Sequence, residues 1–558
     1  MTTFVDILKS YYVEDPERDC VYLQQAGQED QVLTYHDLLN GAAAYANTYK
    51  REGIQPDEVV VLILQHGLDL IYAFWGAVLY GAIPSIMPFL TEKLSPERYQ
   101  ADLAALISVT QPSAIVTYPD FEPIVQKALI EGDSVRKVIS KDEVEPKTFP
   151  SFGTLPGTNR KSEDIVLLQH SSGTTGLKKG VALSHQAVLN QLDAYAESIL
   201  LDPGEDLIVS WLPLYHDMGL VACFLLPVLK GVPLVLMSPF DWVRAPYRLM
   251  QAVSKYGGTL SWLPNFAYNF CAQKIRERHL EGVDLSSWRA LINCSETVQW
   301  ESHQIFFEAF QKYGLRYEAL QTSYAMAENT FGVTQSGMKN EPALDDIKET
   351  MFFEEHVAQP ADGESESMRM MSSGKPIRNT EVRVVDKEGN RVKERVVGEI
   401  ILRSDCMLTE YYNRPGITQD AFRDGWYLTG DFGYFADGEL YVTGRKKDIL
   451  IVGGKNIYPQ DLEELAYEVQ GVHPGRAVAF GVFNEQAGTE DVVLVAESNS
   501  HSQEDKRELA DQIRRHVTRN SPIALRYVKI VEPKWIIKTS SGKASRLANK
   551  EKYLREQK

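Results

Sequence analysis

Residues 165–180 read IVLLQHSSGTTGLKKG, a short apolar run followed at once by hydroxyl, glycine and lysine residues. The apolar run predicts a buried strand. The residues after it suit oxyanions, because glycines let backbone N–H groups approach closely, hydroxyls donate hydrogen bonds, and Lys179 adds positive charge. The segment therefore predicts a strand that leads into a phosphate-binding loop. The loop residues with these properties are Ser171, Ser172, Gly173, Thr174, Thr175 and Gly176.

This loop differs from that of P-loop nucleoside triphosphatases, whose pattern is GxxxxGK[ST]. The glycine–lysine pair in KTSSGK, residues 538–543, does not match either, because Ile537 stands where the first glycine should be. The spacing alone disfavours a P-loop nucleoside triphosphatase.

Apolar runs of the same kind recur on both sides of the loop. Between residues 59 and 88, VVVLILQ and IYAFWGAVLYGAIPSIMP are separated by Gly and Pro breaks, a rhythm typical of a buried parallel sheet with covering helices. The pattern predicts an α/β fold. Further buried strands are predicted at residues 113–117, 207–211, 233–237, 259–263 and 290–293.

The pattern changes after about Gly374. The short alternating runs EVRVVD, GEIILRS and GELYVTG indicate a small antiparallel sheet or barrel. Beyond Gly444, strands near 477–480 and 492–496 and a charged helix over 503–518 indicate a separate α+β portion. The sequence thus predicts an N-terminal domain over 1–444, made of packed α/β subdomains and a barrel-like region, and a small C-terminal domain over 445–558. The acidic stretch 340–367 is interpreted as a surface insertion.

Bulk composition narrows the class of protein. The chain has 558 residues, 44% hydrophobic and 24% charged, as in an ordinary globular protein. A formal charge of -18 argues against binding to nucleic acid, which needs clustered Lys and Arg. Five scattered cysteines without a CxxC pair indicate neither a disulfide framework nor a zinc site, and they favour a reducing cytoplasm.

The sequence predicts no stable membrane insertion. No secretion signal is visible at the start. The most apolar stretch, residues 219–237, is interrupted by Pro227, Lys230, Gly231 and Pro233. These breaks predict a helix, a turn and a buried strand rather than a membrane span.

The segment SSGTTGLKKG resembles the phosphate loop of the adenylate-forming superfamily, which includes acyl-CoA synthetases, nonribosomal-peptide adenylation domains and luciferases. Four further stretches agree in the same order along residues 30–546. They are YAMAE at 324–328, YLTGD at 427–431, GRKKD at 444–448 and KTSSGK at 538–543. The resemblance implies that ATP, with Mg²⁺, activates a carboxylic acid as an acyl-adenylate, and that the C-terminal domain is mobile.

The chemistry of such an activation explains the roles that the resemblance implies. A carboxylate that attacks the α-phosphorus of ATP is repelled by it, so positive charge must lie between them. Lys543 resembles the lysine that bridges the two groups, and Glu328 resembles the glutamate that helps to hold Mg²⁺. Asp431 resembles the acceptor of both ribose hydroxyls, with Arg445 also at the ribose. Lys447 resembles the hinge about which the small domain swings.

The adenine would lie between two segments. The resemblance implies that Tyr324 stacks on it, with Ala325 and Met326 alongside. On the other side, NCSETV at 293–298 aligns with a segment that usually reads NGAEPV, so Ser295 and Glu296 join the nucleotide site. Cys294 and Ser295 stand where Gly-Ala is usual, which reduces backbone freedom. A different acid substrate, a weaker affinity for the nucleotide and a loss of activity are all open interpretations.

The segment WLPLYHDMGL, residues 211–220, carries adjacent histidine and aspartate residues. Adjacent residues on a strand point apart, which disfavours an acid–base pair. The resemblance places His216 beside the substrate carboxylate and ATP in a positioning role, with Tyr215 and Met218 at the substrate. A buried histidine with satisfied hydrogen bonds is the alternative.

Three features resemble the fatty acyl-AMP ligase branch of the superfamily: YHDMGL, the NFAY in LPNFAYNFCAQKI, and NIYPQDLEE. The branch also carries an insertion where this chain has residues 329–372, whose stretch LDDIKETMFFEEHV has the character of an amphipathic helix. Phe266, Ala267 and Tyr268 would line an acyl channel, since an apolar wall suits a fatty chain. The alternative is that they belong to a buried core helix.

The branch resemblance implies that a fatty acid is converted to acyl-AMP and then transferred to the phosphopantetheine thiol of an acyl carrier protein. Two alternatives remain open. One is an acyl-CoA synthetase, which would use coenzyme A as the acceptor. The other is a catalytically silent homologue that serves as a binding module.

Overall fold

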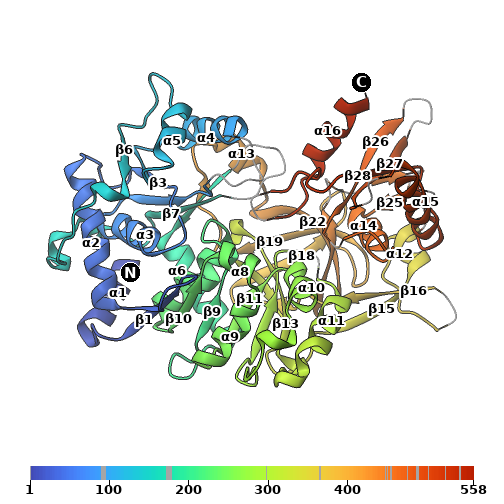
Figure 1. The fold of residues 1–558 in the computed structure, drawn as a ribbon, viewed down its shortest axis with the longest axis horizontal. Coiled ribbons are helices and arrows are strands. Elements are labelled where there is room, and N and C mark those ends of the chain that lie inside the picture. Colours follow the sequence, from blue (N-terminus) through green and yellow to red (C-terminus); the bar gives the residue numbers. More distant parts are fainter. Residues whose placement is uncertain are drawn as a thin grey trace. The chain divides into compact units, whose positions relative to one another are not determined.

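The computed structural model describes residues 2–89, 96–170, 179–296, 298–363, 366–445, 448, 450–452, 455–473, 475–484, 489–499, 502–521, 523, 525–539 and 542–557. The chain divides into two compact units. The first unit comprises residues 1–342, 373–381 and 403–426, and the second comprises 343–372, 382–402 and 427–558. The mixed α/β architecture confirms the predicted fold class (Figure 1). A domain boundary after Gly444 stays a prediction.

The first unit is built on two sheets. The nine-stranded sheet runs in the order β17-β14-β13-β12-β11-β9-β10-β1-β2, and the seven-stranded sheet runs in the order β20-β8-β7-β4-β3-β5-β6. The strands of the nine-stranded sheet are β1 Asp19–Gln24, β2 Gln31–Thr34, β9 Ile208–Ser210, β10 Leu234–Met237, β11 Leu260–Leu263, β12 Ala290–Asn293, β13 Leu320–Ala325, β14 Gly332–Gln335 and β17 Lys375–Pro376. The strands of the seven-stranded sheet are β3 Val59–Leu62, β4 Ile83–Ile86, β5 Ala114–Thr117, β6 Lys137–Ser140, β7 Ile165–His170, β8 Gly180–Ser184 and β20 Glu410–Tyr411.

Helices flank these sheets in the first unit. They are α1 Phe4–Glu14, α2 Tyr35–Arg51, α3 Leu68–Tyr80, α4 Pro96–Thr110, α5 Glu122–Ala128, α6 His185–Ser198, α7 Leu226–Lys230, α8 Pro239–Arg244, α9 Tyr247–Tyr256, α10 Asn265–Lys274, α11 Trp300–Phe310 and α13 Pro415–Asp420. Helices α2 and α3 pack closely against each other, and α3 lies on β3 and β4 (Figure 1). The close approach requires Gly76, because an added Cβ there would lie 2.7 Å from the carbonyl oxygen of Ala42.

The predicted strands of the first unit are confirmed. Each of the five predicted stretches between residues 113 and 293 contains a strand with buried side chains, β5, β9, β10, β11 and β12. The apolar stretch 219–237 forms a π-helix over Met218–Leu225, then α7, a turn at Gly231, and β10. No helix among the described residues is both long and apolar enough to cross a bilayer. All five cysteines are buried thiols.

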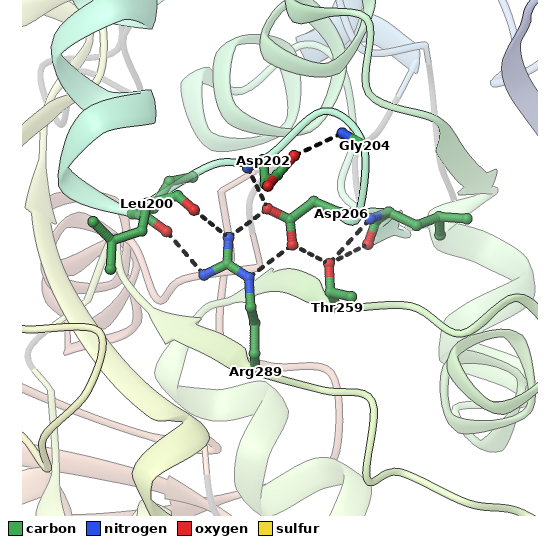
Figure 2. A network of polar contacts seen from close by, with 8 residues as sticks. Leu200, Asp202, Gly204, Asp206, Thr259 and Arg289 are labelled. Carbon is green, nitrogen blue, oxygen red and sulfur yellow. Dashed lines mark hydrogen bonds and ion pairs between the residues drawn. The ribbon is translucent and has the colours of Figure 1, made fainter.

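A buried ion pair joins three strands of the nine-stranded sheet at their amino ends. Asp206 precedes β9, Thr259 precedes β11 and Arg289 precedes β12. The Nε of Arg289 donates to Oδ1 of Asp206 at 2.7 Å, and the hydroxyl of Thr259 donates to the same oxygen at 2.7 Å. Arg289 also donates to the carbonyl oxygens of Ile199 and Leu200 (Figure 2). The side chain of Asp206 is only 2% exposed. This network fixes the relative positions of the three strands.

The second unit holds the small sheets. The remaining strands lie in the second unit, apart from β21 and single ends of β18, β19 and β22. They are β15 Leu344–Lys348, β16 Ser367–Met371, β18 Thr380–Val385, β19 Gly398–Ser404, β21 Phe422–Arg423, β22 Trp426–Ala436, β23 Glu439–Arg445, β24 Leu450–Val452, β25 Lys455–Ile457, β26 Ala477–Asn484, β27 Thr489–Glu497 and β28 Tyr527–Val531. The helices of the second unit are α12 Glu349–Glu355, α14 Pro459–Tyr467, α15 Gln503–Arg519 and α16 Arg546–Gln557. The antiparallel pairing of β19, β22 and β23 and the charged helix α15 confirm the predictions for these regions.

The acidic insertion is more than the predicted surface segment. Its first part contains strand β15, which pairs with β16, and among its described residues only 349–355 form an α-helix. Asp345 accepts hydrogen bonds from Arg395 and from the hydroxyl of Tyr434. Ile347, Phe352 and Phe353 are buried in one cluster with residues of β22 and β23. The surface interpretation was therefore wrong for these side chains, because the insertion supplies part of the core of the second unit.

Candidate active site

Four of the sequence motifs lie at one edge of the nine-stranded sheet. Strands β9, β11, β12 and β13 are neighbours in that order and pair in parallel, so their carboxyl ends share an edge. The segment with LYHDM follows β9, NFAY follows β11, CSE follows β12, and YAMAE begins on β13. In open α/β sheets this edge is where ligands bind. The topology therefore collects the predicted adenine and substrate residues at one place.

The two segments predicted to contact adenine lie at the ends of the adjacent strands β12 and β13. Tyr324 and Ala325 are the last residues of β13, and the N–H of Met326 donates to the carbonyl oxygen of Phe331 at 2.8 Å. Ser295 has a φ of 72°, a left-handed conformation that non-glycine residues seldom adopt. Its hydroxyl donates to the sulfur of Met218 at 3.8 Å, which brings this predicted nucleotide residue together with a predicted substrate residue.

Hydrogen bonds connect the predicted adenine segment after β12 to the predicted acyl segment. Oε2 of Glu296 accepts from the backbone N–H of Phe266 at 3.0 Å, in the first turn of α10, where N–H groups lack partners within the helix. The amide oxygen of Asn265 accepts from Asn293 at 2.9 Å and from the N–H of Gln299 at 3.1 Å. The beginning of α10 is thereby fixed to the segment that would back the adenine.

One face of α10 belongs to an aromatic wall. The rings of Phe266 and Phe270 lie 6.4 and 5.3 Å from the ring of Trp242 in α8. Trp242 in turn stacks on Trp211, with centroids 3.5 Å apart and planes at 2°. Sequence reasoning found Phe266 but missed the other three residues. The spacing of Phe266 and Phe270, four residues apart on a helix, is a signal that could have found Phe270.

The opposite face of α10 packs into the core. The ring of Tyr268 stacks on His303 of α11 at 5.0 Å, and its hydroxyl donates to the carbonyl oxygen of Leu291 at 3.0 Å. Tyr268 and its neighbour Ala267 are completely buried. Residues two apart on a helix point in different directions, so the structure does not bring Tyr268 together with Phe266. The structure thus places Tyr268 in the core, as the alternative interpretation of a buried core helix predicts.

The segment after β9 turns sharply. His216 lies in a turn rather than on a strand, and its ring makes an edge contact with that of Tyr215 at 4.9 Å. Burial raises the pKa of Tyr215 to about 12, so its hydroxyl stays protonated. Oδ1 of Asp217 accepts from the N–H of Met218 at 2.9 Å, where the π-helix begins. The carboxylate of Asp217 thus has a capping role, and the expectation that His216 and Asp217 lie on a strand was wrong because the chain turns here.

The predicted phosphate loop is flanked by an antiparallel strand pair. Strand β7 precedes the loop and β8 follows it, and His170 is the register partner of Gly180. The predicted strand before the loop is therefore confirmed. The loop itself is residues 171–178, so Ser171, Ser172, Gly173, Thr174, Thr175 and Gly176 lie outside the described residues.

Lys179 and Glu328 both contact a residue that sequence reasoning missed. The hydroxyl of Tyr411 donates to Oε1 of Glu328 at 2.8 Å. The ammonium of Lys179 lies over the Tyr411 ring, 4.6 Å from its centroid. Tyr411 stands 83 positions after Glu328 in the sequence, and no local motif connects the three residues. The structure brings the predicted metal ligand and the phosphate-loop lysine to one tyrosine.

The second unit contains the predicted ribose residues. Asp431 on β22 and Arg445 on β23 are register partners, and the Nε of Arg445 lies 3.3 Å from Oδ1 of Asp431. Asp431 is 7% exposed, so it lies on a buried part of a strand. The structure therefore pairs the two residues within this unit.

Lys543 lies in a small hairpin. Lys538 and Ala544 form an antiparallel bridge, and the N–H of Thr539 donates to the carbonyl oxygen of Lys543 at 2.7 Å. Gly542 has a φ of 86°, as the turn requires. The buried side chain of Asn549 holds the base of the hairpin by hydrogen bonds with both backbone groups of Ile537. The hairpin fixes the backbone from which Lys543 projects.

A buried ion cluster connects this hairpin to the GRKKD segment within the second unit. Arg546, three residues after Lys543, donates to both oxygens of Glu463 at 2.9 and 2.8 Å. It also lies 3.4 Å from Asp448. Burial and the neighbouring Glu463 raise the pKa of Asp461 to about 7. The predicted hinge residue Lys447 lies outside the described residues.

Comparisons with known proteins agree with this geometry. The family profile of AMP-binding enzymes matches residues 12–412. The medium-chain-fatty-acid–[acyl-carrier-protein] ligase JamA of Moorena producens is 30% identical, over 99% of this chain and 95% of that protein. The long-chain-fatty-acid–AMP ligase FadD26 of Mycobacterium bovis is 30% identical, over 93% of this chain and 91% of that protein. A solved structure from work on fatty acyl-adenylate ligases of E. coli and L. pneumophila has a TM-score of 0.89 at 28% identity, over 100% of this chain and 98% of that chain.

Proposed function

Because this chain belongs to the AMP-binding enzyme family, we propose that it is a fatty acyl-AMP ligase that loads an acyl carrier protein. The observation that carries the proposal is the parallel order of β9, β11, β12 and β13, whose neighbouring carboxyl ends carry the YHDM, NFAY, CSE and YAMAE segments. A relative of matching length is named as a ligase of fatty acids to acyl carrier protein. ATP is the nucleotide of this chemistry.

The first step joins the acid to AMP. A carboxylate oxygen of the fatty acid bonds to the α-phosphorus of ATP, and the bond from that phosphorus to the bridging oxygen breaks, so pyrophosphate leaves. Lys543 supplies the charge that offsets repulsion between the two anions. Lys179 and the hydroxyl residues of the phosphate loop bind the phosphates, and the carboxylate of Asp431 accepts hydrogen bonds from the ribose hydroxyls. His216 positions the carboxylate of the fatty acid, and Lys447 is the hinge of the C-terminal domain.

The residues present fit a role for Mg²⁺. This ion is usually held by one or two carboxylates together with substrate phosphates. Glu328 supplies one such carboxylate, and a carboxylate that accepts from Tyr411 through Oε1 still has capacity to bind a cation. Bound Mg²⁺ would offset the negative charge of the phosphates. Glu328 is the residue that would hold it.

The aromatic wall supports an apolar acid as the substrate. Phe266, Phe270, Trp242 and Trp211 form a continuous series of ring contacts beside the adenine segment. Phe266 and Phe270 are the partly exposed members of this series, and burial of a chain against them gains about 0.8 kcal/mol for each CH₂ group. The wall therefore favours a fatty acid over a short polar one.

The acceptor in the second step is proposed to be the phosphopantetheine thiol of a carrier protein. Its sulfur bonds to the acyl carbon, the acyl–phosphate bond breaks, and AMP leaves. We expect purified enzyme with ATP, Mg²⁺ and mixed fatty acids to acylate a phosphopantetheinylated carrier protein at least about tenfold faster than coenzyme A, as measured by mass spectrometry. Faster acylation of coenzyme A would identify an acyl-CoA synthetase instead. An enzyme that forms no acyl-adenylate from any acid would contradict the whole proposal.

The hinge prediction separates the two steps. Proline at position 447 would fix φ and restrict the residue before it, so it should hinder the swing of a mobile domain over 445–558. We expect Lys447→Pro to keep acid-dependent pyrophosphate exchange within about threefold of the parent but to lower thioester formation at least about tenfold. Lys447→Ala is the control, because it removes the ammonium without restricting the backbone. Equal losses in both steps would show that Lys447 has no hinge role.

A further inference from the structure

Strand β20 holds Tyr411 against the strand that follows the phosphate loop. Tyr411 is the register partner of Val181, and the N–H of Tyr412 donates to the carbonyl oxygen of Gly180 at 2.8 Å. The N–H of Leu408 donates to the carbonyl oxygen of Glu328 at 2.8 Å. The segment 408–412 is therefore hydrogen-bonded both to the end of the loop and to the segment of the metal ligand. Tyr411 itself is 2% exposed, so its side chain has little freedom.

The two ends of the Tyr411 side chain serve two different groups. The hydroxyl donates to one oxygen of Glu328, which restricts the rotation of the carboxylate. The ring face attracts the ammonium of Lys179 through its quadrupole. An aromatic partner orients this ammonium without neutralising its charge, whereas a carboxylate partner would compete with phosphate. Tyr411 thus orients both the carboxylate of Glu328, a predicted metal ligand, and the ammonium of Lys179.

We propose that Tyr411 is a positioning residue that presents Lys179 and Glu328 together to the triphosphate and its divalent cation. The inference rests on the roles given to these two residues in the proposed function. Partners that orient a metal ligand typically change metal affinity by about 10- to 100-fold when they are lost. The two halves of the role are separable, because phenylalanine keeps the ring and loses only the hydroxyl.

ATP binding without any acid tests the inference apart from catalysis. Isothermal titration calorimetry with ATP, in EDTA and over a series of Mg²⁺ concentrations, gives the Mg²⁺ concentration for half-maximal enhancement of binding. We expect Tyr411→Phe to raise that concentration about tenfold and to leave affinity for ATP in EDTA within about twofold. Tyr411→Leu, which also loses the ring, should weaken binding in EDTA by about threefold or more. Tyr412→Phe is the matched control and should match the parent protein.

A double-variant comparison excludes a merely structural effect. If Tyr411 acts through Glu328, Tyr411→Phe should have no further effect on the Mg²⁺ dependence once Glu328→Gln is present. Equal Mg²⁺ dependence in Tyr411→Phe and the parent, or additive effects in the double variant, would overturn the inference. Because no fatty acid is present, these outcomes differ from a failure of the proposed function, in which ATP binds normally but no acyl-adenylate forms.

Discussion

Alanine in place of Lys543 is expected to lower acid-dependent pyrophosphate exchange by roughly 100- to 1,000-fold, which is the typical effect of losing one group that stabilises transition-state charge. The ammonium of Lys543 would lie between the attacking carboxylate and the α-phosphate, where repulsion is greatest. The fold should remain intact, because backbone hydrogen bonds of Thr539 and the side chain of Asn549 hold the hairpin. Circular dichroism and thermal unfolding check that expectation.

A nearby lysine provides the control for this variant. Lys550→Ala removes an ammonium from α16 and should leave exchange unchanged. The thioester step should distinguish a specific loss of adenylation from a general loss of activity. Lys543→Ala should still transfer the acyl group from chemically prepared acyl-AMP to the carrier thiol, since the adenylate already exists. Near-parental pyrophosphate exchange by Lys543→Ala would refute the role given to this residue.

Methionine in place of Arg289 is expected to cost about 3 kcal/mol of folding stability, because it leaves the carboxylate of Asp206 buried without its cation. Arg289 is partly exposed, so the loss should fall at the lower end of the range for broken buried pairs. We expect the midpoint temperature of the first unfolding transition in a thermal melt to fall by about 5 °C. Arg316→Met, an exposed substitution in the same unit, should change it little. An equal change in both variants would contradict a stabilising role for the pair.

The same variant should show a characteristic pH dependence. In the parent, burial would raise the pKa of Asp206, but hydrogen bonds from Arg289 and from backbone and Thr259 donors lower it below its ordinary value of 3.8. A lowered pKa means that the contribution to stability is complete above the unfolded pKa and is lost only as pH falls through the folded value. Without Arg289 the carboxyl group gains a proton more readily. The stability deficit of Arg289→Met should therefore shrink as the pH falls from neutrality toward the ordinary pKa of 3.8, and a constant deficit would contradict this expectation.

The sequence predicted the elements whose cause is local. Strands β9, β10, β11 and β12 of the nine-stranded sheet are short apolar runs between turn residues. Parallel order was implied by the alternation of strands and helices.

Residues whose role depends on distant partners were missed. Nothing near Tyr411 in the sequence indicates Lys179 or Glu328, because the contact arises when β20 pairs with β8. The stack of Trp211 on Trp242 likewise joins two segments through tertiary packing alone. The insertion was misjudged for a related reason: its charged residues suggested solvent, while Ile347 and Phe352 complete a core that other strands define.

The amino ends of the parallel strands in the nine-stranded sheet carry a stabilising ion pair, and their carboxyl ends carry the candidate active site. This separation has a consequence for directed evolution. The ion pair of Arg289 and Asp206 stabilises the amino edge, whereas the aromatic wall stands at the carboxyl edge. Distant substitutions usually have additive effects on stability. A library confined to Phe266 and Phe270, whose side chains are partly exposed, should therefore yield many well-folded enzymes with shifted acyl-chain preference. Recruitment of new acids by this scaffold would need few compensating changes elsewhere.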